Sequence, residues 1–385
     1  MSGAPTPDRA RIRLSRSVVG PEEVAAVTRV LLEDGYLGMG REVQAFEEEL
    51  KRFLETEGEV ICVGSGTAAL HLGVAAVTRP GDEVLVQSLT YVSDFQAITA
   101  AGAEPVACEV DPATMAIDLK DAARRLTGRT RAIMPVHYAG HPGDRDALYA
   151  FAREHRLRVV EDAAHALGST YRGRPVGAEG DLFCFSFDGI KNFTAGEGGA
   201  VVTADPQAAA WVRDTRLLAV ARDTERRYAG ERSWEFDVGH QGYRYHLSNL
   251  FAAIGRAQIR KFPEFRRRRR ALARRYDERL GDLPDLAFFA FDREAMVPHI
   301  YPLRVLEGRR DGLRAFLVGQ GVECGVHYFP NHRLRFFARP GVSLPVSDRL
   351  YEELLTLPLH PALTEAEQAR VVELVTAFLT QEGAP

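Results

Sequence analysis

The chain has 385 residues, of which 45% are hydrophobic and 26% are charged, so it has the composition of an ordinary soluble globular protein with room for two domains. Its formal net charge of −4 provides no strong positive field for nucleic acid or an anionic membrane. No apolar run is long enough to span a bilayer, and the first residues lack the apolar core of a signal peptide. We therefore expect a cytoplasmic protein without a nucleic-acid or membrane partner.

Short runs rich in β-branched residues recur through the first two thirds of the chain, and helical stretches such as 67–77 and 144–155 separate several of them. Strands that alternate with helices predict an α/β fold with a mainly parallel sheet covered on both faces. Several of the runs are continuously apolar, as in strands buried on both sides. The expected strands are 59–63, 83–88, 104–108, 131–136, 157–162, 181–187 and 199–204.

The pattern changes after about residue 249. A helical stretch at 250–280, interrupted at Pro263, carries five consecutive arginines at 266–270. Weaker strand and helix signals follow, and we expect a large domain at 1–250 and a smaller α/β domain at 251–385 that is entered by this long helix. The weaker signals lie at 297–305, 310–320, 322–328 and 365–380.

The arginine run has two interpretations, a nucleic-acid site and a solvated helix face. Acidic residues nearby, among them Glu264 and Asp277, dilute its charge, and the whole chain is slightly negative. These features favour the solvated face.

The four cysteines, Cys62, Cys108, Cys184 and Cys324, lie far apart, and no pair has the spacing of a metal or redox motif. Three of them lie within apolar runs. We expect buried free thiols in a reducing compartment and no metal site.

A carboxylate closes one of the expected strands. Asp162 ends the run 157–162, and small residues follow it. Because ligands of open α/β sheets bind beyond the carboxyl ends of the strands, Asp162 suits a place in that crevice. The alternative is an N-cap of a following helix, a position that short acids often occupy.

Two other strand ends carry features of a ligand site. The turn Gly64-Ser65-Gly66-Thr67 opens a helix, whose free N–H groups form an anion site that the glycines let a phosphate approach. This motif is weak alone and lacks the spacing of a nucleotide-binding loop. Tyr91 follows another strand and suits stacking against a flat ring, although a core or rim aromatic is the more common role.

Lys191 lies between an apolar run and a glycine-rich run. It has two interpretations, an ordinary surface lysine in a hairpin and a buried amine held for covalent chemistry. Together, a phosphate cradle, a ring stacker, an acid at a strand end and a lysine are the groups that pyridoxal 5′-phosphate needs. The lysine forms a Schiff base with its aldehyde, and the acid keeps its pyridine nitrogen protonated.

With these residues in place, the chain resembles the DegT/DnrJ/StrS-type sugar aminotransferases, which are pyridoxal phosphate-dependent. The resemblance covers nearly the whole chain, and its most specific block is SFDGIKNFTAGEGG at 186–199. It implies the type I fold of aspartate aminotransferase, with a large domain built on a mainly parallel seven-stranded sheet flanked by helices and a smaller C-terminal α/β domain.

The resemblance also implies roles for individual residues. Lys191 matches the Schiff-base lysine and proton shuttle, Asp162 the acid at the pyridine nitrogen, and Tyr91 the stacking aromatic. His165 lies where many relatives have a glutamine beside the ring hydroxyl. The phosphate-binding positions correspond to Gly66, Thr67, Ala68 and Ser186.

Four residues are candidates for the substrate side. Tyr36 lies in a matching N-terminal segment, and His327 and Tyr328 lie in a segment that the family has near its substrate. A structural histidine is an equal alternative for His327, and bracing of the glycine-rich turn is an alternative for Glu197.

Two segments depart from the family pattern. Many relatives read Gly-Tyr-Asn-Tyr-Arg in the segment that reaches the neighbouring subunit's site, where this chain has Arg244 in place of the asparagine. We expect Arg244 to meet the cofactor phosphate. At 188–190, Asp-Gly-Ile replaces His-Pro-x and reshapes the substrate side.

The resemblance implies a homodimer with its sites at the subunit interface.

The implied reaction moves an amino group from an amino acid, by family habit L-glutamate, to a keto group of a nucleotide-linked deoxysugar. The block at 190–199 favours the 4-keto position. On charge alone, Arg41, Arg222 and Arg244 are candidate pyrophosphate partners. A 3-keto sugar, a cyclitol or aminobenzoate-type precursor and a non-catalytic cofactor-binding regulator remain open. A sugar 3-dehydratase of this fold carries histidine in place of Lys191, which argues against that activity.

Overall fold

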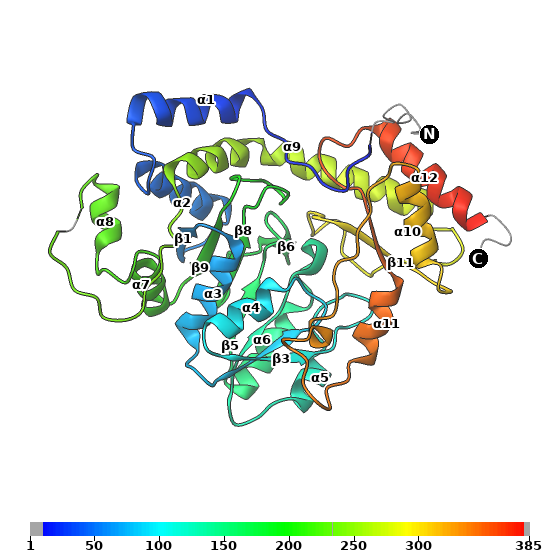
Figure 1. The fold of residues 1–385 in the computed structure, drawn as a ribbon, viewed down its shortest axis with the longest axis horizontal. Coiled ribbons are helices and arrows are strands. Elements are labelled where there is room, and N and C mark those ends of the chain that lie inside the picture. Colours follow the sequence, from blue (N-terminus) through cyan, green and yellow to red (C-terminus); the bar gives the residue numbers. More distant parts are fainter. Residues whose placement is uncertain (1–10, 233, 381–385) are drawn as a thin grey trace, which may run out of the picture.

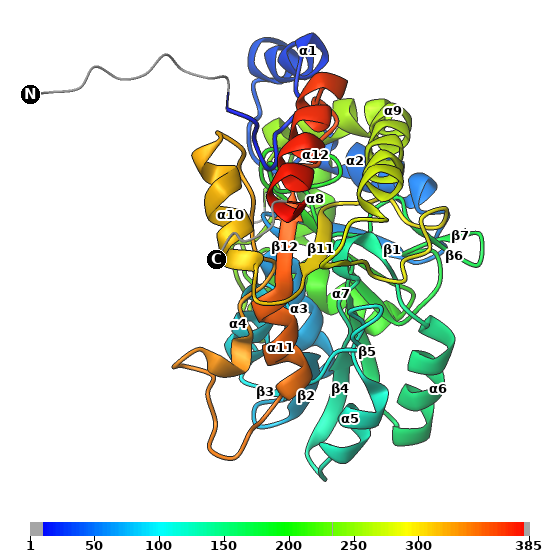
Figure 2. The same ribbon diagram turned by 90° about the vertical axis from the view of Figure 1, so that its right-hand side faces the viewer.

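A computed structural model describes residues 11–232 and 234–380 of the chain, and Figures 1 and 2 show its fold. The strands of its large sheet are β1 Glu59–Val63, β2 Glu83–Gln87, β3 Glu104–Cys108, β4 Thr130–Met134, β5 Arg158–Asp162, β8 Leu182–Ser186 and β9 Gly199–Thr203. Among the described residues, this sheet has seven strands in the order β1-β9-β8-β5-β4-β2-β3. Neighbours from β8 to β3 are parallel, and β9 runs against both of its neighbours. The expected strands all form, with bounds within two residues of the expected ones.

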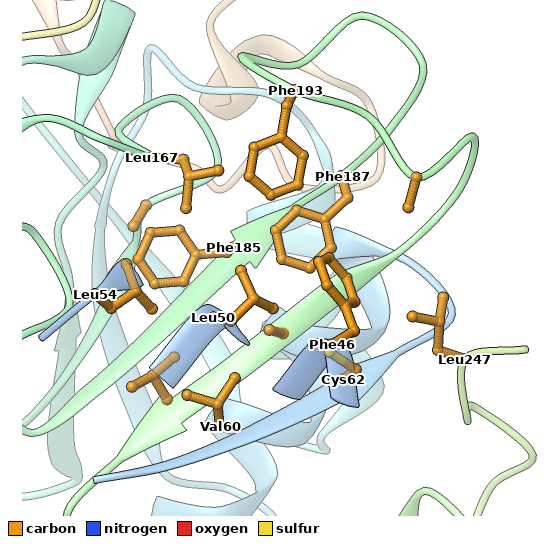
Figure 3. Close-up of a cluster of buried hydrophobic side chains, with 14 of the residues drawn as sticks. Phe46, Leu50, Leu54, Val60, Cys62, Leu167, Phe185, Phe187, Phe193 and Leu247 are labelled. Atoms are coloured by element: carbon orange, nitrogen blue, oxygen red, sulfur yellow. The ribbon is translucent and has the colours of Figure 1, made fainter. Parts of the chain in front are cut away.

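Helices cover both faces of the sheet, which explains why its strands read as continuous apolar runs. Alternate residues of β8 face opposite sides. Phe185 packs in a buried cluster with Phe46 of α2 (Arg41–Phe53), whereas Cys184 packs on the other side with residues of α3 (Gly66–Val77). Figure 3 shows the first of these clusters, in which Phe185 and Phe187 lie beside Phe46 and Leu50.

The contact between α3 and the sheet is close enough to require a glycine. If Gly73 carried a β-carbon, that atom would lie 2.8 Å from Leu182 Cδ2 and 2.9 Å from Cys184 Sγ, nearer than non-bonded atoms normally approach. Since α3 follows β1 along the chain, its N-terminus is held at the carboxyl edge of the sheet.

The long helix α9 (Asn249–Leu280) runs unbroken through Pro263, so the expected interruption is wrong. Proline removes one backbone hydrogen bond, but α9 is packed against α2 and α1 (Pro21–Arg29). Phe262 and Phe265 on either side of the proline are buried in the core. Figure 1 shows α9 passing beneath α1 and across the molecule toward α12. Tertiary packing thus holds the helix through the proline.

The arginine run is only partly a solvated face. Residues 266–268 are exposed, as expected, but Arg269 is 1% exposed, which contradicts the expectation for that residue. Its guanidinium donates to the carbonyl oxygens of His299 at 3.0 Å, Pro298 at 3.3 Å and Lys191 at 3.4 Å. Arg269 therefore links the long helix to the loop that carries Lys191.

The C-terminal part is built on an antiparallel sheet of β10 (Leu286–Ala287), β11 (Tyr301–Val305) and β12 (Leu354–Leu357). The sequence signal at 322–328 does not form a helix or strand. Its residues Val322 and Gly325 instead make isolated bridges to Ile12 and Thr356. The N-terminal segment thereby crosses to the C-terminal part, and the division near residue 250 stays a prediction.

The remaining elements are mostly short, and α12 packs against α10 and α9 in the C-terminal part. The other helices and strands are α4 Ser93–Ala100, α5 Leu119–Arg124, α6 Arg145–His155, α7 Pro206–Thr215, α8 Asp223–Tyr228, α10 Arg310–Gly319, α11 Pro345–Glu353, α12 Glu365–Thr380, β6 Thr170–Tyr171 and β7 Arg174–Pro175, with single turns of other helical types at η1 Val30–Asp34, η2 Tyr138–Gly140 and η3 Asn331–Arg333. The sequence did not predict α11 and β12, which follow each other directly at 345–357 with no turn residue between them to mark two elements.

The cysteines are free, as expected, but their burial is not uniform. Cys62, Cys108 and Cys184 are buried, whereas Cys324 is partly exposed, so the expectation of burial is wrong for that residue. Cys324 follows α10 at the edge of the C-terminal core, where packing is incomplete. Across residues 11–232 and 234–380, we find no helix with the length and apolarity needed to span a membrane.

Candidate active site

A cavity of about 360 Å³ opens at the carboxyl ends of the parallel strands. Because these ends meet at one edge of the sheet, residues far apart in sequence converge there. The cavity brings together most of the residues expected to form the site. The predicted residues that line it are Gly66, Thr67, Tyr91, Asp162, His165, Ser186, Lys191, Glu197, His327 and Tyr328.

Lys191 lies in the loop that follows β8, and its amine points into a largely buried environment. Burial lowers the pKa of Lys191, while the charges of Asp162 and Asp188 oppose that shift. A backbone hydrogen bond from Lys191 N to Asp188 O at 3.1 Å and the contact with Arg269 hold the loop. The result is a buried amine with an increased neutral fraction, not a surface lysine in a hairpin.

Asp162 is the last residue of β5 and is buried at the cavity wall. Its Oδ1 accepts a hydrogen bond from Ala164 N at 2.9 Å, and no regular helix follows, so it is not the N-cap of a helix. Burial raises the pKa of Asp162, whereas the Ala164 N–H and the charges of Lys191 and His137 oppose the rise. A cationic ligand nitrogen would complete the coordination of this carboxyl.

The N-terminus of α3 forms the anion cradle. The Ser65 side chain caps the helix by accepting from Ala68 N at 3.1 Å, while the N–H groups of Gly66 and Thr67 have no partner within an α-helix. A β-carbon added to Gly66 would lie 2.7 Å from Ser186 Cβ, so only glycine lets the N-terminus of α3 approach β8 this closely. Ser186 and the two free N–H groups therefore face the same space.

His165 belongs to a group of neutral aromatic side chains. Its Nε2 lies 3.1 Å from the Tyr328 hydroxyl, and its ring centroid lies 4.2 Å from that of His299. Burial, together with the charge of Lys191, lowers the pKa of His165 well below the ordinary value. The same causes lower the pKa of His327 to about 4, and its Nδ1 lies 2.9 Å from Thr356 Oγ1. These histidines act as neutral hydrogen-bonding groups.

Two residues form the outer rim of the cavity. Tyr91 is 57% exposed although it is aromatic, and its ring lies 5.7 Å from that of Tyr328 at a tilt of 50°. Glu197 is largely exposed, and partial desolvation of its carboxyl together with the charge of nearby Asp188 raises its pKa. The exposed ring of Tyr91 is available to cover a flat ligand.

The other predicted residues lie outside this cavity. Arg244 and Ala68 line a neighbouring hollow of about 300 Å³, which shares Ser65 and Thr67 with the cavity wall. Tyr36 and Arg41 line a separate hollow of about 320 Å³ beside α8. Arg222 precedes α8 and lines neither. Within one copy of the chain, these residues are not brought to Lys191.

Sequence reasoning missed several residues at the cavity, among them Thr90, Asp94 and His299. Thr90 and His299 line the cavity, and Asp94 lies directly behind it, as its charge interaction with Asp162 shows. Thr90 directly precedes Tyr91, so its position at a strand end was a usable signal, whereas Asp94 resembles an ordinary acid in the first turn of a helix. His299 lies in a loop before β11 and has no such signal.

The residues present fit pyridoxal phosphate. The free N–H groups of α3 suit its phosphate, and Asp162 suits a protonated ring nitrogen. The Nδ1 atoms of His165 and His299 are buried and have no hydrogen-bond partner within the described residues, so polar groups remain for a ligand to satisfy. Lys191 supplies the amine that its aldehyde needs.

Solved structures similar to this chain are aminotransferases. TlmJ from Streptoalloteichus hindustanus is 35% identical, with 95% of this chain and 98% of that chain covered and a TM-score of 0.86. DesV from S. venezuelae is 34% identical, with 94% and 95% covered and a TM-score of 0.86. A putative sugar aminotransferase from Streptococcus pneumoniae, solved in PMP and PLP forms, is 28% identical over 95% of this chain, with TM-scores of 0.88 and 0.87 and 97% and 98% of those chains covered.

The family model described as the DegT/DnrJ/EryC1/StrS aminotransferase family matches residues 18–376. With the solved structures, this match confirms the family, the type I fold, the transaminase class and the pyridoxal phosphate cofactor that the sequence predicted. The chain belongs to the DegT/DnrJ/EryC1/StrS aminotransferase family.

Proposed function

We propose that the protein transfers an amino group from L-glutamate to the 4-keto group of a nucleotide-linked deoxysugar. When bound, pyridoxal phosphate supplies an aldehyde for the amino group and a ring that accepts electrons. A sugar acceptor is supported by the similarity to a protein described as a sugar aminotransferase. The 4-keto preference rests on the block at 190–199.

The observation that carries this proposal is the buried amine of Lys191 in one cavity with Asp162 and the N-terminus of α3. With its pKa lowered by burial, the Lys191 amine takes up a proton and returns it, as a general acid–base must. Asp162 holds the proton on the ring nitrogen. Gly66, Thr67 and Ser186 bind the phosphate, and Tyr91 covers the ring.

In this proposal His165 lies beside the ring hydroxyl of the cofactor as a catalytic residue, while Tyr328, His327 and Glu197 meet the substrate. A neutral histidine and a tyrosine hydroxyl suit sugar hydroxyl groups, since they donate or accept without requiring a charge. Asp188 and Glu197 give the rim acidic character, so the pyrophosphate of the substrate is better met by arginines elsewhere. Arg41, Arg222 and Arg244 are the proposed partners.

These arginines and Tyr36 lie outside the Lys191 cavity of their own subunit, which supports a homodimer with sites at the interface. Trp234, Phe236 and Val238 are 84%, 61% and 48% exposed in the segment that precedes Arg244. Three exposed apolar side chains in one segment favour burial against a second copy. The free thiols suit the reducing conditions of the cytoplasm.

The first test is the visible spectrum of the purified protein with pyridoxal phosphate. We expect a yellow band that bleaches with L-glutamate and returns when a 4-keto nucleotide sugar is added. If the yellow band returns with a 3-keto sugar or a cyclitol ketone instead, the acceptor is a different one. A protein that forms no band, or whose band ignores every amino donor, contradicts the proposed function.

A further inference from the structure

A second buried carboxyl lies behind the cavity. Asp94 is in the first turn of α4, which follows the carboxyl end of β2, and its side chain is 0% exposed. Its Oδ2 accepts a hydrogen bond from the Thr90 hydroxyl. Its Oδ1 is buried and meets no hydrogen-bond donor in the part of the chain that the structure describes. An ionised carboxylate in this position would leave one oxygen unsatisfied, at considerable cost.

The group that faces Asp94 is the carboxyl of Asp162 at the end of β5, which is separated from β2 by β4 in the sheet. Burial and the charge of Asp162 raise the pKa of Asp94 well above the ordinary value, and the two carboxyls lie close enough for one to donate to the other if it holds a proton. Two carboxyl groups bond to each other only if one of them holds a proton. The surroundings therefore decide which carboxyl is neutral.

The donors and cations are distributed unequally between the two carboxyls. Asp162 accepts from Ala164 N and faces the charges of Lys191 and His137. Asp94 has the Thr90 hydroxyl and a weaker interaction with Lys191. Two more titratable groups face the pair, Cys184 and Tyr328, and burial raises the pKa of both, so they remain neutral. Asp162 is thus the better place for the negative charge.

We propose that Asp94 is a neutral carboxylic acid that donates a hydrogen bond from Oδ1 to Asp162, and that it is a positioning residue for the carboxylate facing the cofactor ring. The role at the ring rests on the proposed function. A donor behind Asp162 fixes the orientation of its carboxylate and makes it a weaker base. The proton between Asp162 and the ring nitrogen then stays on nitrogen, where it makes the ring a stronger electron sink.

The state of Asp94 is tested in the protein without cofactor by comparing it with Asp94→Asn, which keeps a donor and removes the titration. Since the pKa of Asp94 is raised on folding, its contribution to stability is present at low pH and is lost as pH rises above the ordinary carboxyl range. We expect Asp94→Asn to gain melting temperature relative to wild type as pH rises toward neutral. A difference that does not change with pH over this range means that Asp94 is ionised, and overturns the proposal.

Infrared spectroscopy gives a second, direct readout. Wild-type protein at neutral pH should show the C=O band of a neutral carboxylic acid, and Asp94→Asn should lose intensity there. The matched control is Asp121→Asn, because Asp121 is also buried but is ion-paired with Arg124 and Arg125. That control should leave the band unchanged. Unchanged intensity in Asp94→Asn would show that Asp94 carries no proton.

Cofactor binding tests the positioning role separately. Asp94→Leu has similar bulk and no donor, so we expect it to bind pyridoxal phosphate about tenfold to a hundredfold more weakly, as for loss of a hydrogen bond to a charged group. Asp94→Asn should restore binding to near the wild-type value. Equal affinity of all three proteins overturns the positioning role. If none of them binds the cofactor, the proposed function fails, while the infrared result on Asp94 stands independently.

Discussion

The two carboxyls that end β5 are adjacent in sequence and have opposite environments. Glu161 is fully buried, and its oxygens accept from Arg145 at 2.8 and 2.9 Å and from Tyr149 at 2.6 Å, with His137 Nε2 also at 2.8 Å. Burial alone would raise the pKa of Glu161, but the hydrogen bonds from His137 and Arg145 outweigh it and lower the pKa to about 2.

Asp162, on the other side of the strand, accepts one backbone hydrogen bond and has a raised pKa. Successive side chains of a strand point to opposite faces, so a single position separates a satisfied structural cluster from an incompletely satisfied site. A buried carboxyl with its hydrogen bonds complete stabilises the fold, whereas one left incomplete at a cavity is available to a ligand. Each side of β5 should therefore respond differently to substitution.

The largest effect is expected on the cavity side, from Lys191→Ala. Removing the general acid–base and the covalent link should lower transaminase turnover by at least about a thousandfold and abolish the yellow band. Stopped-flow and absorbance measurements with glutamate check this. The control is Lys120→Ala, which should behave as wild type because Lys120 is exposed and does not line the cavity. Substantial turnover in Lys191→Ala would contradict the assignment of this residue.

Asp162→Asn should have the next largest effect, because it keeps the shape of the side chain and removes the charge. We expect turnover to fall about a hundredfold, the equivalent of losing a charge-assisted hydrogen bond in the transition state. The free energy of unfolding should change little, since the carboxyl removed is incompletely satisfied. If Asp162→Asn greatly lowered the free energy of unfolding while its folded fraction kept wild-type turnover, Asp162 would be a structural residue like Glu161.

On the opposite side, Glu161→Gln should destabilise the fold and leave the chemistry intact. Breaking a buried ion pair leaves Arg145 uncompensated, at about 3–5 kcal/mol. Urea unfolding measures this loss, and the cofactor affinity of the folded fraction should stay near wild type. The stabilisation by Glu161 is present above the ordinary carboxyl pKa and is lost as pH falls toward about 2, because its folded pKa is lowered. The stability difference should therefore shrink in acid.

The smallest effect is expected from Tyr149→Phe, which removes one hydrogen bond to Glu161 and the acceptor for Asp181 N at 2.8 Å. We expect a loss of about 1–2 kcal/mol in urea unfolding and unchanged turnover. Tyr171→Phe is a matched control, because its hydroxyl bonds Asp144 at 3.3 Å near the surface and contributes less. Equal losses for the two variants would contradict the importance of the Glu161 cluster.

The core of the site was predictable because its signals are local. Lys191 and Asp162 both follow apolar strands and have small residues beside them, and strand ends of a parallel sheet must meet at one edge. The glycine at position 66 similarly marks a place where a helix start approaches another backbone closely. Such signals need only short-range pattern and the geometry of the sheet.

Residues that depend on packing between distant segments were not predictable. Asp94 resembles an ordinary acid in the first turn of a helix, and only the tertiary fold brings it close to Asp162. Arg269 resembles its exposed neighbours in the run, and only the loops at 298 and 359 bury it. Pro263 reads as a break, yet packing on both sides maintains the helix.

The sequence by itself predicted the strands of the large sheet and their mainly parallel arrangement, and it made Lys191 and Asp162 the candidates for the reactive lysine and its partner acid. These follow from hydrophobic period, chain order and turn residues, which are local properties. Only the tertiary structure decided which carboxyls are satisfied, which histidines are neutral and which arginine is buried. Those properties depend on how much water is removed from a group and which donors remain within reach of it, and side chains distant in sequence set both.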